Sequence, residues 1–179
     1  KLYADDSKLI GKVNDGLDQN MLQDDLIEVC KWCDNWKMAL NFKKCKIMHF
    51  GPKIFDSNYH LLDDRNKNHP ITESLCERDL GLLVPVNMKW KEQVTASTNK
   101  ANRMLGLLRN SFAYRGLDLW RVLYLTYARP LIEFANACWL PPNRQEIEKL
   151  ELVQRKATKI PIESKNLDYG NRLKQWNIS

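Results

Sequence analysis

Two adjacent aspartates, Asp5 and Asp6, stand in the segment Tyr3-Ala4-Asp5-Asp6 near the start of the sequence. Two carboxylates held close together disfavour each other's ionisation unless a cation lies between them. Mg²⁺ takes oxygen ligands, and proteins commonly hold it with one or two carboxylates plus the phosphates of a substrate. The pair therefore suits metal-dependent nucleotidyl transfer, in which the ions steady the attacking and leaving oxygens. The alternative is an ordinary solvated turn, because aspartate is common in turns.

The two carboxylates converge only if the chain turns there, since neighbouring side chains on an extended strand point to opposite faces. Extended-favouring residues at 1–3 and 8–10 flank the polar turn and predict a β-hairpin. Apolar residues then recur at helical spacing from about residue 18 to about residue 39, with Asn41 as a stop signal. Residues 46–50 predict a strand and 51–75 a loop with a weak hairpin. Residues 78–86 predict a strand whose Gly81 indicates a bulge or a close backbone approach.

The rest of the sequence is helical in character. Apolar residues at helical spacing predict three helices, around 94–108, 119–126 and 147–160. The second is expected to end at Arg129-Pro130 and the third at Pro161, because proline breaks the hydrogen-bond ladder of a helix. We therefore expect an α+β protein with a mixed first part, residues 1–86, and an all-helical second part, residues 87–179.

The formal net charge of +6 is unevenly distributed along the 179 residues. Residues 1–100 contain equal numbers of basic and acidic residues, whereas residues 101–179 contain thirteen basic and seven acidic ones. A local basic excess favours a polyanion partner such as nucleic acid, and a solvated basic surface explains the charge equally well. No run of about 18 apolar residues occurs, so we expect no membrane-spanning helix. Five cysteines without the spacing of a secreted scaffold favour an intracellular protein.

Seven segments occur in order along the chain: YADDSKL, LQDDL, WCDNWKMALNFKKCKIMHF, RDLGLLV, KANRMLGLLR, YARPLIEFA and LELVQRKATK. Together they resemble the reverse transcriptase of jockey-type non-LTR retrotransposons, over essentially the whole chain. The resemblance implies the C-terminal part of a polymerase palm in residues 1–86 and a helical thumb and connector in residues 87–179. The implied activity is RNA-directed DNA polymerisation, with an RNA template, a DNA primer and dNTPs as partners. Mg²⁺ or Mn²⁺ is the implied cofactor, and nucleus and cytoplasm are the implied locations.

The resemblance also implies roles for residues of the palm. Asp5 and Asp6 match its metal-binding turn, with Tyr3 beside the nucleotide and the primer end. Lys44 matches a lysine near the phosphates of the incoming nucleotide. A lysine there can neutralise or protonate the pyrophosphate leaving group. The alternative for Lys44 is an exposed basic edge that it shares with Lys43 and Lys46.

Further residues would contact the primer and the duplex. Leu80 and Gly81 match the primer-grip strand, and the alternative is a glycine needed only for packing. Lys100, Arg103 and Arg109 lie on or beside one expected helix of the thumb, where they can contact phosphates along a primer–template duplex.

The sequence departs from the family at one important point. No position matches the third metal-binding aspartate, and by resemblance that residue, the fingers and any endonuclease domain belong upstream. We therefore expect the chain by itself to be inactive as a polymerase. The alternative function is a non-catalytic nucleic-acid-binding module left from a decayed element.

Cys30, Cys33, Cys45 and His49 have the residue types of a zinc site. However, the first two lie on the apolar stripe of the expected helix, and the other two straddle an expected strand. At about 3.3 Å per residue, a strand would separate Cys45 from His49 by roughly 13 Å. Such a separation is incompatible with shared ligation of one ion, so ordinary buried thiols are the favoured interpretation.

Overall fold

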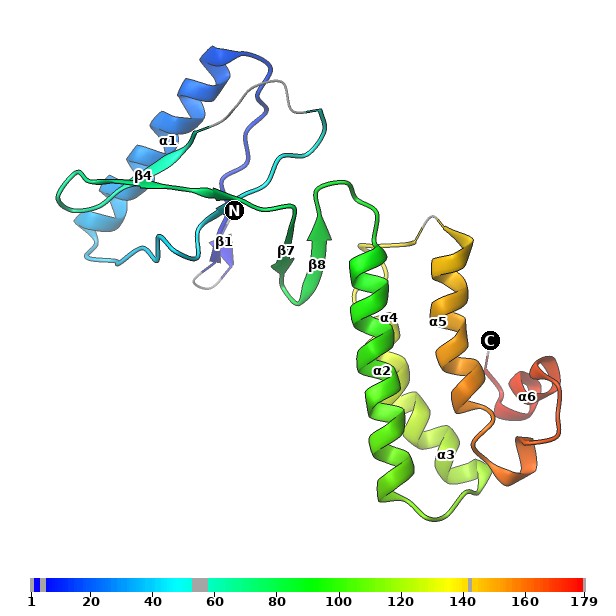
Figure 1. Cartoon of the computed structure of the whole chain (residues 1–179). Coiled ribbons are helices and arrows are strands. Elements are labelled where there is room, and N and C mark those ends of the chain that lie inside the picture. Colours follow the sequence, from blue (N-terminus) through cyan, green and yellow to red (C-terminus); the bar gives the residue numbers. More distant parts are fainter. Residues whose placement is uncertain (1, 4–5, 53–57, 142, 179) are drawn as a thin grey trace. The chain divides into compact units, whose positions relative to one another are not determined.

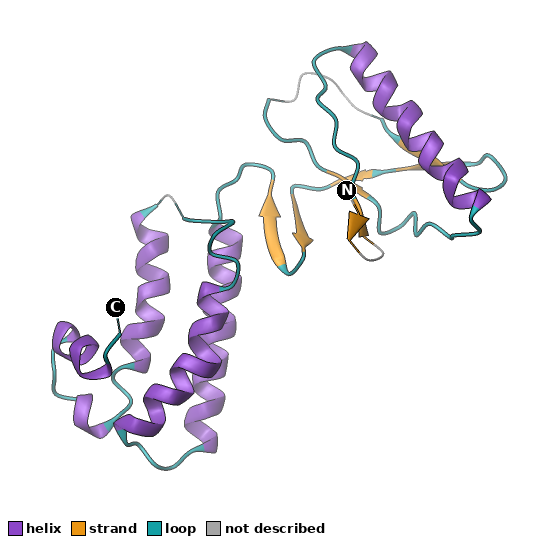
Figure 2. Ribbon diagram, turned by 180° about the vertical axis from the view of Figure 1, so that it is seen from behind, coloured by secondary structure: helices purple, strands orange, loops and turns teal. Residues whose placement is uncertain are grey.

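The computed structural model describes residues 2–3, 6–52, 58–141 and 143–178 (Figures 1 and 2). The chain divides into two compact units, Lys1–Cys76 and Glu77–Ser179. The first combines one long helix with short strands, and the second combines a strand pair with helices. This mixture agrees with the expected α+β class, whereas the expected division after residue 86 falls inside the second unit. Within the described ranges, no helix is both long enough and apolar enough to cross a membrane.

The long helix of the first unit, α1, runs from Gly16 to Asn35. It begins at Asp15, whose carboxylate accepts a hydrogen bond from the Asp18 backbone N–H at 2.9 Å and so caps the N-terminus. Just after the helix, Lys37 takes a left-handed φ of 56°, a conformation that commonly terminates helices. The predicted helix is therefore confirmed, although it ends before the expected stop.

The strands of the first unit are short. They are β1 (Leu2–Tyr3), β2 (Asp6–Ser7), β3 (Lys46–Ile47), β4 (His60–Leu62), β5 (Asn68–Pro70) and β6 (Thr72–Glu73). β1 pairs antiparallel with β2 and β4 with β5, whereas β3 and β6 are parallel. The hairpin expected within residues 51–75 is thus confirmed as β4–β5. Of the strand expected at 46–50, only Lys46 and Ile47 form a strand, which pairs with β6.

A glutamine side chain joins α1 to β4. Gln23 donates from Nε2 to the His60 carbonyl at 3.0 Å and accepts from the His60 N–H at 3.0 Å. One amide therefore satisfies both backbone groups of a strand residue, as a neighbouring strand would. Further along, the Leu62 N–H donates to Cys30 Sγ at 3.4 Å. Cys30 and Leu61 are buried, so polar contacts and burial together hold this helix on this strand.

The second unit begins with a hairpin of β7 (Cys76–Asp79) and β8 (Leu82–Pro85), joined by Leu80 and Gly81. The φ angles of these two residues are 46° and 90°, and both central residues of a type I′ turn must have positive φ. The expectation of one continuous strand over 78–86 is therefore wrong. The chain reverses at Gly81 because glycine adopts positive φ without steric strain.

Helix α2, Lys91–Ser111, confirms the first helix predicted for this unit. It contacts β8, the π-helical turn η1 (Tyr124–Ala128), α4 (Arg129–Glu133) and α5 (Arg144–Ala157). One stripe of α2 is buried: Gln93, Val94, Ser97, Thr98, Ala101, Leu105 and Leu108. The apolar spacing that predicted this helix rests on Val94, Thr98, Ala101, Leu105 and Leu108. All five lie on the buried stripe, so the core-facing side of α2 follows from the sequence pattern.

The helical path does not end at Arg129-Pro130, contrary to expectation. Helix α3 (Leu117–Leu123) continues through η1 into α4, and Pro130 lies at the start of α4. A proline is tolerated in the first turn of a helix because the N–H groups there have no intrahelical partner. The π-helical turn before it lets the chain take up the proline without leaving the helical path.

The C-terminal elements complete the core of the second unit. α5 confirms the third predicted helix, but ends at Ala157 rather than at Pro161. The 3₁₀ turn η2 (Ile162–Ser164) and helix α6 (Tyr169–Trp176) follow, and the sequence did not predict α6. Trp120 and Trp176 are fully buried.

One buried cation lies in this part of the core. The Arg172 side chain donates from Nε to Thr158 Oγ1 at 3.2 Å and from Nη1 to the Leu167 carbonyl at 3.0 Å. These bonds tie α6 to the end of α5.

The β7–β8 turn yields a stability prediction. Leu80→Asn should raise the free energy of unfolding of the chain by about 1 kcal/mol, because asparagine tolerates the left-handed region better than leucine. Leu80 is 53% exposed, so little buried surface is lost. Gly81→Ala should lower the free energy of unfolding, since a Cβ at φ 90° is strained and would lie 3.4 Å from the Phe134 ring. Urea unfolding followed by fluorescence measures the free energy of unfolding of both variants. An equal decrease in the two would contradict the assigned type I′ turn.

Candidate functional site

The hairpin expected around the aspartate pair is present in the backbone. β1 and β2 pair antiparallel, with Tyr3 opposite Asp6 and Leu2 opposite Ser7. The second strand therefore begins at Asp6, earlier than the residues 8–10 expected from the sequence. Asp5 lies outside the described residues. The ladder nevertheless brings two of the candidate site residues, Tyr3 and Asp6, to the same cross-strand position.

A magnesium or manganese ion would draw its protein ligands at this hairpin from Asp5 and Asp6. Carboxylate oxygens suit these hard cations, so the donor chemistry fits. In the described part of the chain, no group of three or more His, Cys, Asp or Glu side chains is arranged to hold a metal ion.

Lys44 lies in the same unit as the hairpin but in a separate turn. Its backbone N–H donates to the Asn41 carbonyl at 3.0 Å, which closes the turn before β3. Its side chain is exposed. The described contacts do not link Lys44 to β1 or β2, so they do not bring it to the aspartate pair.

Leu80 and Gly81, the candidate primer-grip residues, form the exposed β7–β8 turn rather than the middle of a strand. The Leu83 N–H of β8 donates to Gln93 Oε1 at 3.0 Å, and Gln93 Nε2 donates to Ser97 Oγ at 3.0 Å. These bonds anchor the hairpin to the buried stripe of α2. A backbone turn held in this way can approach another molecule closely, because glycine presents no side chain.

Lys100, Arg103 and Arg109, here called the α2 basic face, are all exposed. At about 100° per residue, Arg103 lies opposite the buried stripe of α2, whereas Lys100 and Arg109 lie at the two edges of that stripe. None of the ion pairs found between described residues involves them. On the neighbouring helix α5, Lys156 Nζ donates to Asn102 Oδ1 at 3.5 Å and adds a fourth positive charge beside α2. Unpaired cations on rigid helices are suited to phosphate contacts.

The cysteines considered for zinc are mainly packing groups. Cys30 and Cys33 are buried on the side of α1 that faces β4. Burial raises the pKa of the Cys33 and Cys45 thiols, which disfavours the thiolate form that binds metals. The described cysteines and histidines belong to no group of three or more that could hold an ion.

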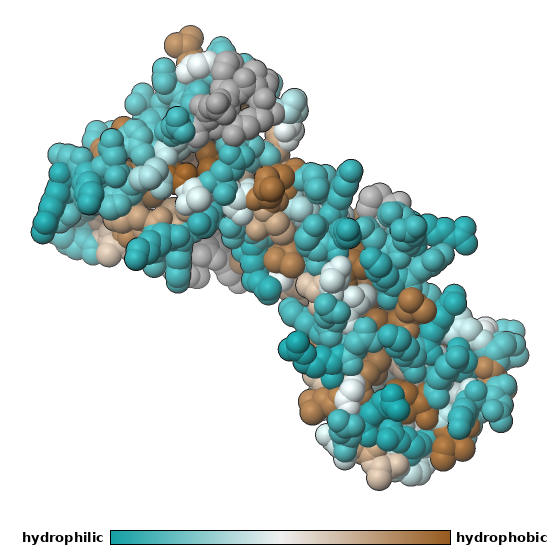
Figure 3. All heavy atoms as spheres, viewed as in Figure 1, coloured by the Kyte–Doolittle hydropathy of each residue, from teal (hydrophilic) through white to brown (hydrophobic). Residues whose placement is uncertain are grey.

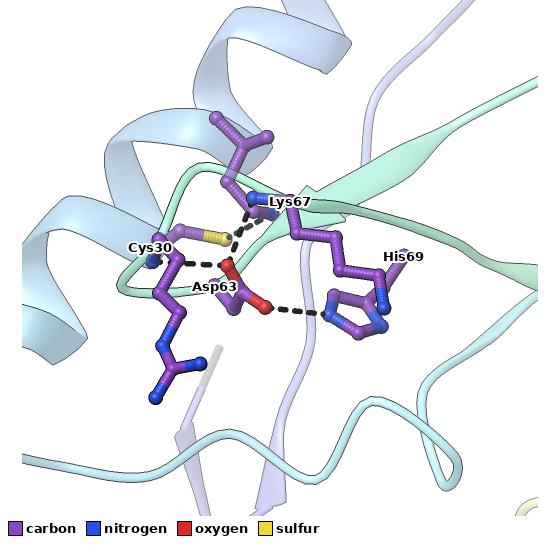
Figure 4. A network of polar contacts seen from close by, with 6 residues as sticks. Cys30, Asp63, Lys67 and His69 are labelled. Atoms are coloured by element: carbon purple, nitrogen blue, oxygen red, sulfur yellow. Dashed lines mark hydrogen bonds and ion pairs between the residues drawn. The ribbon is translucent and has the colours of Figure 1, made fainter.

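Sequence reasoning missed one polar cluster, at the turn of the β4–β5 hairpin (Figure 4). Asp63 Oδ2 lies 3.0 Å from His69 Nε2, and Asp63 Oδ1 accepts from the backbone N–H groups of Arg65 and Lys67 at 3.0 and 2.8 Å. The Phe42 ring stacks on His69 with centroids 4.3 Å apart. The β4–β5 register pairs Leu61 with His69, so Asp63, just past the end of β4, comes close to His69 only through that pairing. No local spacing signal in the sequence reveals the contact.

No protein-family model, no curated protein and no solved structure matches this chain significantly. The residues themselves therefore carry every functional argument that follows.

The Asp63 cluster gives a pH prediction. The His69 hydrogen bond, together with the backbone bonds from Lys67 and Arg65, lowers the pKa of Asp63 from 3.8 to about 2. Because the folded-state pKa is depressed, its stabilising contribution is complete above about pH 4 and is lost as the pH falls to about 2. Asp63→Asn should remove this part of the acid dependence. Carbon-13 NMR of the carboxyl group measures the pKa, and a midpoint near 4 would contradict the cluster.

Proposed function

We propose that this chain is a palm and thumb portion of a reverse transcriptase like those of jockey-type non-LTR retrotransposons. The observation that carries the proposal is the β1–β2 ladder, which pairs Tyr3 with Asp6 on either side of the Ala4-Asp5 step. A Tyr-Ala-Asp-Asp segment in a hairpin suits metal-dependent nucleotidyl transfer, because carboxylates held close together can bind divalent cations. The order of the seven motif segments supports the same proposal.

In this proposal, Asp5 and Asp6 hold the divalent cations and Tyr3 borders the nucleotide. The bound ions supply charge stabilisation for the attacking and leaving oxygens of the transferred phosphoryl group. Lys44 provides a positive charge, and a proton if needed, for the pyrophosphate leaving group. Leu80 and Gly81 bring the β7–β8 turn against the primer strand.

The α2 basic face binds the primer–template duplex in this proposal. Lys100, Arg103 and Arg109 contact phosphates, which orient a duplex without reading its sequence. The buried stripe of α2 supports this role, because it holds the exposed face on a rigid helix. The basic excess of residues 101–179 adds long-range attraction for a polyanion.

A second candidate function is a nucleic-acid-binding module without catalysis. It is favoured by the exposed side chains of Lys100, Arg103 and Arg109, which can contact phosphates without a metal site. A primer-extension assay with the chain, an RNA template, dNTPs and Mg²⁺ separates the two candidates. We expect no extension by the chain alone, and extension that Asp5→Ala abolishes would assign the catalytic function to these residues.

Metal binding at the hairpin is tested with Mn²⁺, whose unpaired electrons broaden nearby NMR signals. We expect weak binding that broadens the amide signals of Tyr3 and Asp6, because two carboxylates alone form a poor site. Asp5→Asn combined with Asp6→Asn should abolish this broadening, since the variant keeps the side-chain size and removes both charges.

A matched control for the metal prediction exists on α1. Asp24 and Asp25 are also adjacent aspartates, but they lie on a helix rather than at a hairpin. Asp24→Asn combined with Asp25→Asn should leave the broadening at the hairpin unchanged. Equal broadening at the two pairs would show non-specific attraction of the cation and would remove the support for a metal site.

Duplex binding is tested by its salt dependence. Each phosphate contact contributes about 0.9 to the log–log slope of affinity against salt for B-form DNA. Arg103→Ala or Arg109→Ala should therefore lower the slope by about one unit and weaken binding similarly for all sequences. Fluorescence anisotropy of an RNA–DNA hybrid with chain 1–179 at several salt concentrations measures this slope.

The control for duplex binding is Arg144→Ala. The Arg144 side chain is 92% exposed and already paired with Glu148 at 3.2 Å, so its loss should change the slope little. A flat salt response, or the same slope in an Arg103→Ala/Arg109→Ala variant as in the parent chain, would reduce the α2 basic face to a solvated surface.

A further inference from the structure

Helix α1 carries a second apolar stripe on the side that does not face β4. Leu17, Met21, Trp32 and Trp36 lie within an arc of about 100° when the helix is projected at about 100° per residue. Their side chains are 73%, 66%, 50% and 68% exposed. Apolar side chains reach the surface at several points in both units (Figure 3), but here four large ones follow one helix face. These four residues are called the outer stripe.

The two tryptophans form the most distinctive part of the outer stripe. The ring centroids of Trp32 and Trp36 are 6.2 Å apart and the planes are tilted by 41°. Among the buried residues of α1, Cys30 lies on roughly the opposite side of the helix, and both tryptophans are at least half exposed. The indole faces therefore contribute little to the core of the first unit. Large aromatic side chains that are rigid and exposed are typical anchors of protein interfaces.

The charges around the outer stripe are mainly negative. Asp25 and Glu28 fall inside the same arc, between Met21 and the tryptophans, and Asp24 adjoins it. All three side chains are exposed, and the base beside them, Lys31, is paired with Glu28 at 2.7 Å. Carboxylates next to indole faces favour a cationic partner, because an Arg or Lys group gains both an ion pair and a cation–π contact there.

We propose that the outer stripe is a docking surface for a basic amphipathic helix of a partner protein. Its aliphatic side chains cover Trp32, Trp36, Met21 and Leu17, and its Arg or Lys side chains meet Asp25 and Glu28. Such a helix matches both properties of the surface, an apolar stripe at helical spacing and a negative charge within it. This inference concerns α1 alone and does not depend on the proposed polymerase function.

The same charges argue against two other occupants. In a symmetric antiparallel pair of α1 helices centred on the outer stripe, Asp25 of one copy would face Glu28 of the other, and like charges at an interface are unfavourable. A nucleic acid would bring its phosphates toward the same carboxylates, which oppose its binding. Both occupants are nevertheless distinguishable in the experiment.

The test measures binding of the full chain to two labelled helical peptides of 18 residues by fluorescence anisotropy. The first peptide has leucines on one face and lysines and arginines on the other. The second has glutamates in place of the lysines and arginines. We expect only the basic peptide to bind, with an affinity that falls as salt is added. Trp32→Ala combined with Trp36→Ala should weaken binding by a factor on the order of ten or more. Asp25→Asn combined with Glu28→Gln should weaken it and reduce the salt dependence.

Two control variants share the chemistry but not the location. Leu140→Ala removes another highly exposed apolar side chain in the second unit, and Asp34→Asn removes a charge of α1 outside the arc. Both should bind like the parent chain, and circular dichroism should give equal helix content for all variants. No binding of the basic peptide, binding of both peptides, or equal binding by the tryptophan variant would overturn the proposal. Self-association or nucleic-acid binding that requires Trp32 and Trp36 would also overturn it, by assigning the surface to another occupant.

Discussion

The buried stripe of α2 is the constraint on which the second unit depends. Val94, Ala101 and Leu105 are nearly inaccessible to solvent, and the elements packed on this stripe come from both sides of it in the sequence. Gln93 extends the same stripe to β8 through the hydrogen bond from the Leu83 N–H. Because one face of α2 is committed to the core, Arg103 on the opposite face and Lys100 at the edge of the buried stripe are exposed to solvent. The position of the candidate phosphate contacts is thus a direct consequence of core packing.

The first unit is organised differently, because its core is small. α1 is held on β4 by the Gln23 amide and by the Cys30 thiol as much as by buried apolar side chains. The hairpin that follows is braced by Asp63 and His69, with Phe42 stacked on the imidazole. A helix of this length buries only part of its apolar surface on strands of two or three residues. The exposed indoles of α1 follow from that mismatch, and they belong to the docking surface proposed above.

The two candidate sites have different physical requirements. A metal at the β1–β2 hairpin depends on charge concentrated at one turn, and its two carboxylates need further ligands from a substrate or another segment. Duplex binding at α2 depends on charges spread along a rigid helix, and each contact adds independently. The helical unit can meet the requirement for duplex binding through its own packing. Metal binding depends on groups beyond the aspartate pair. The two proposed activities, nucleic-acid binding and catalysis, therefore call for separate tests.

The sequence by itself determined the elements whose residues repeat at a fixed period. The stripe of α2 and the existence of α1 follow from local spacing, and the polar turn at Asp5 and Asp6 predicted a hairpin because local chemistry selects it. Only tertiary structure decided the rest. Leu80 takes a left-handed conformation because β7 and β8 pair across it, and Pro130 stays within a helical path because α4 packs on α2. Asp63 contacts His69 only because β4 and β5 pair. The spacing of such residues along the sequence follows neither the helical nor the strand period. The free energy of packing, rather than local conformational preference, therefore selects these contacts.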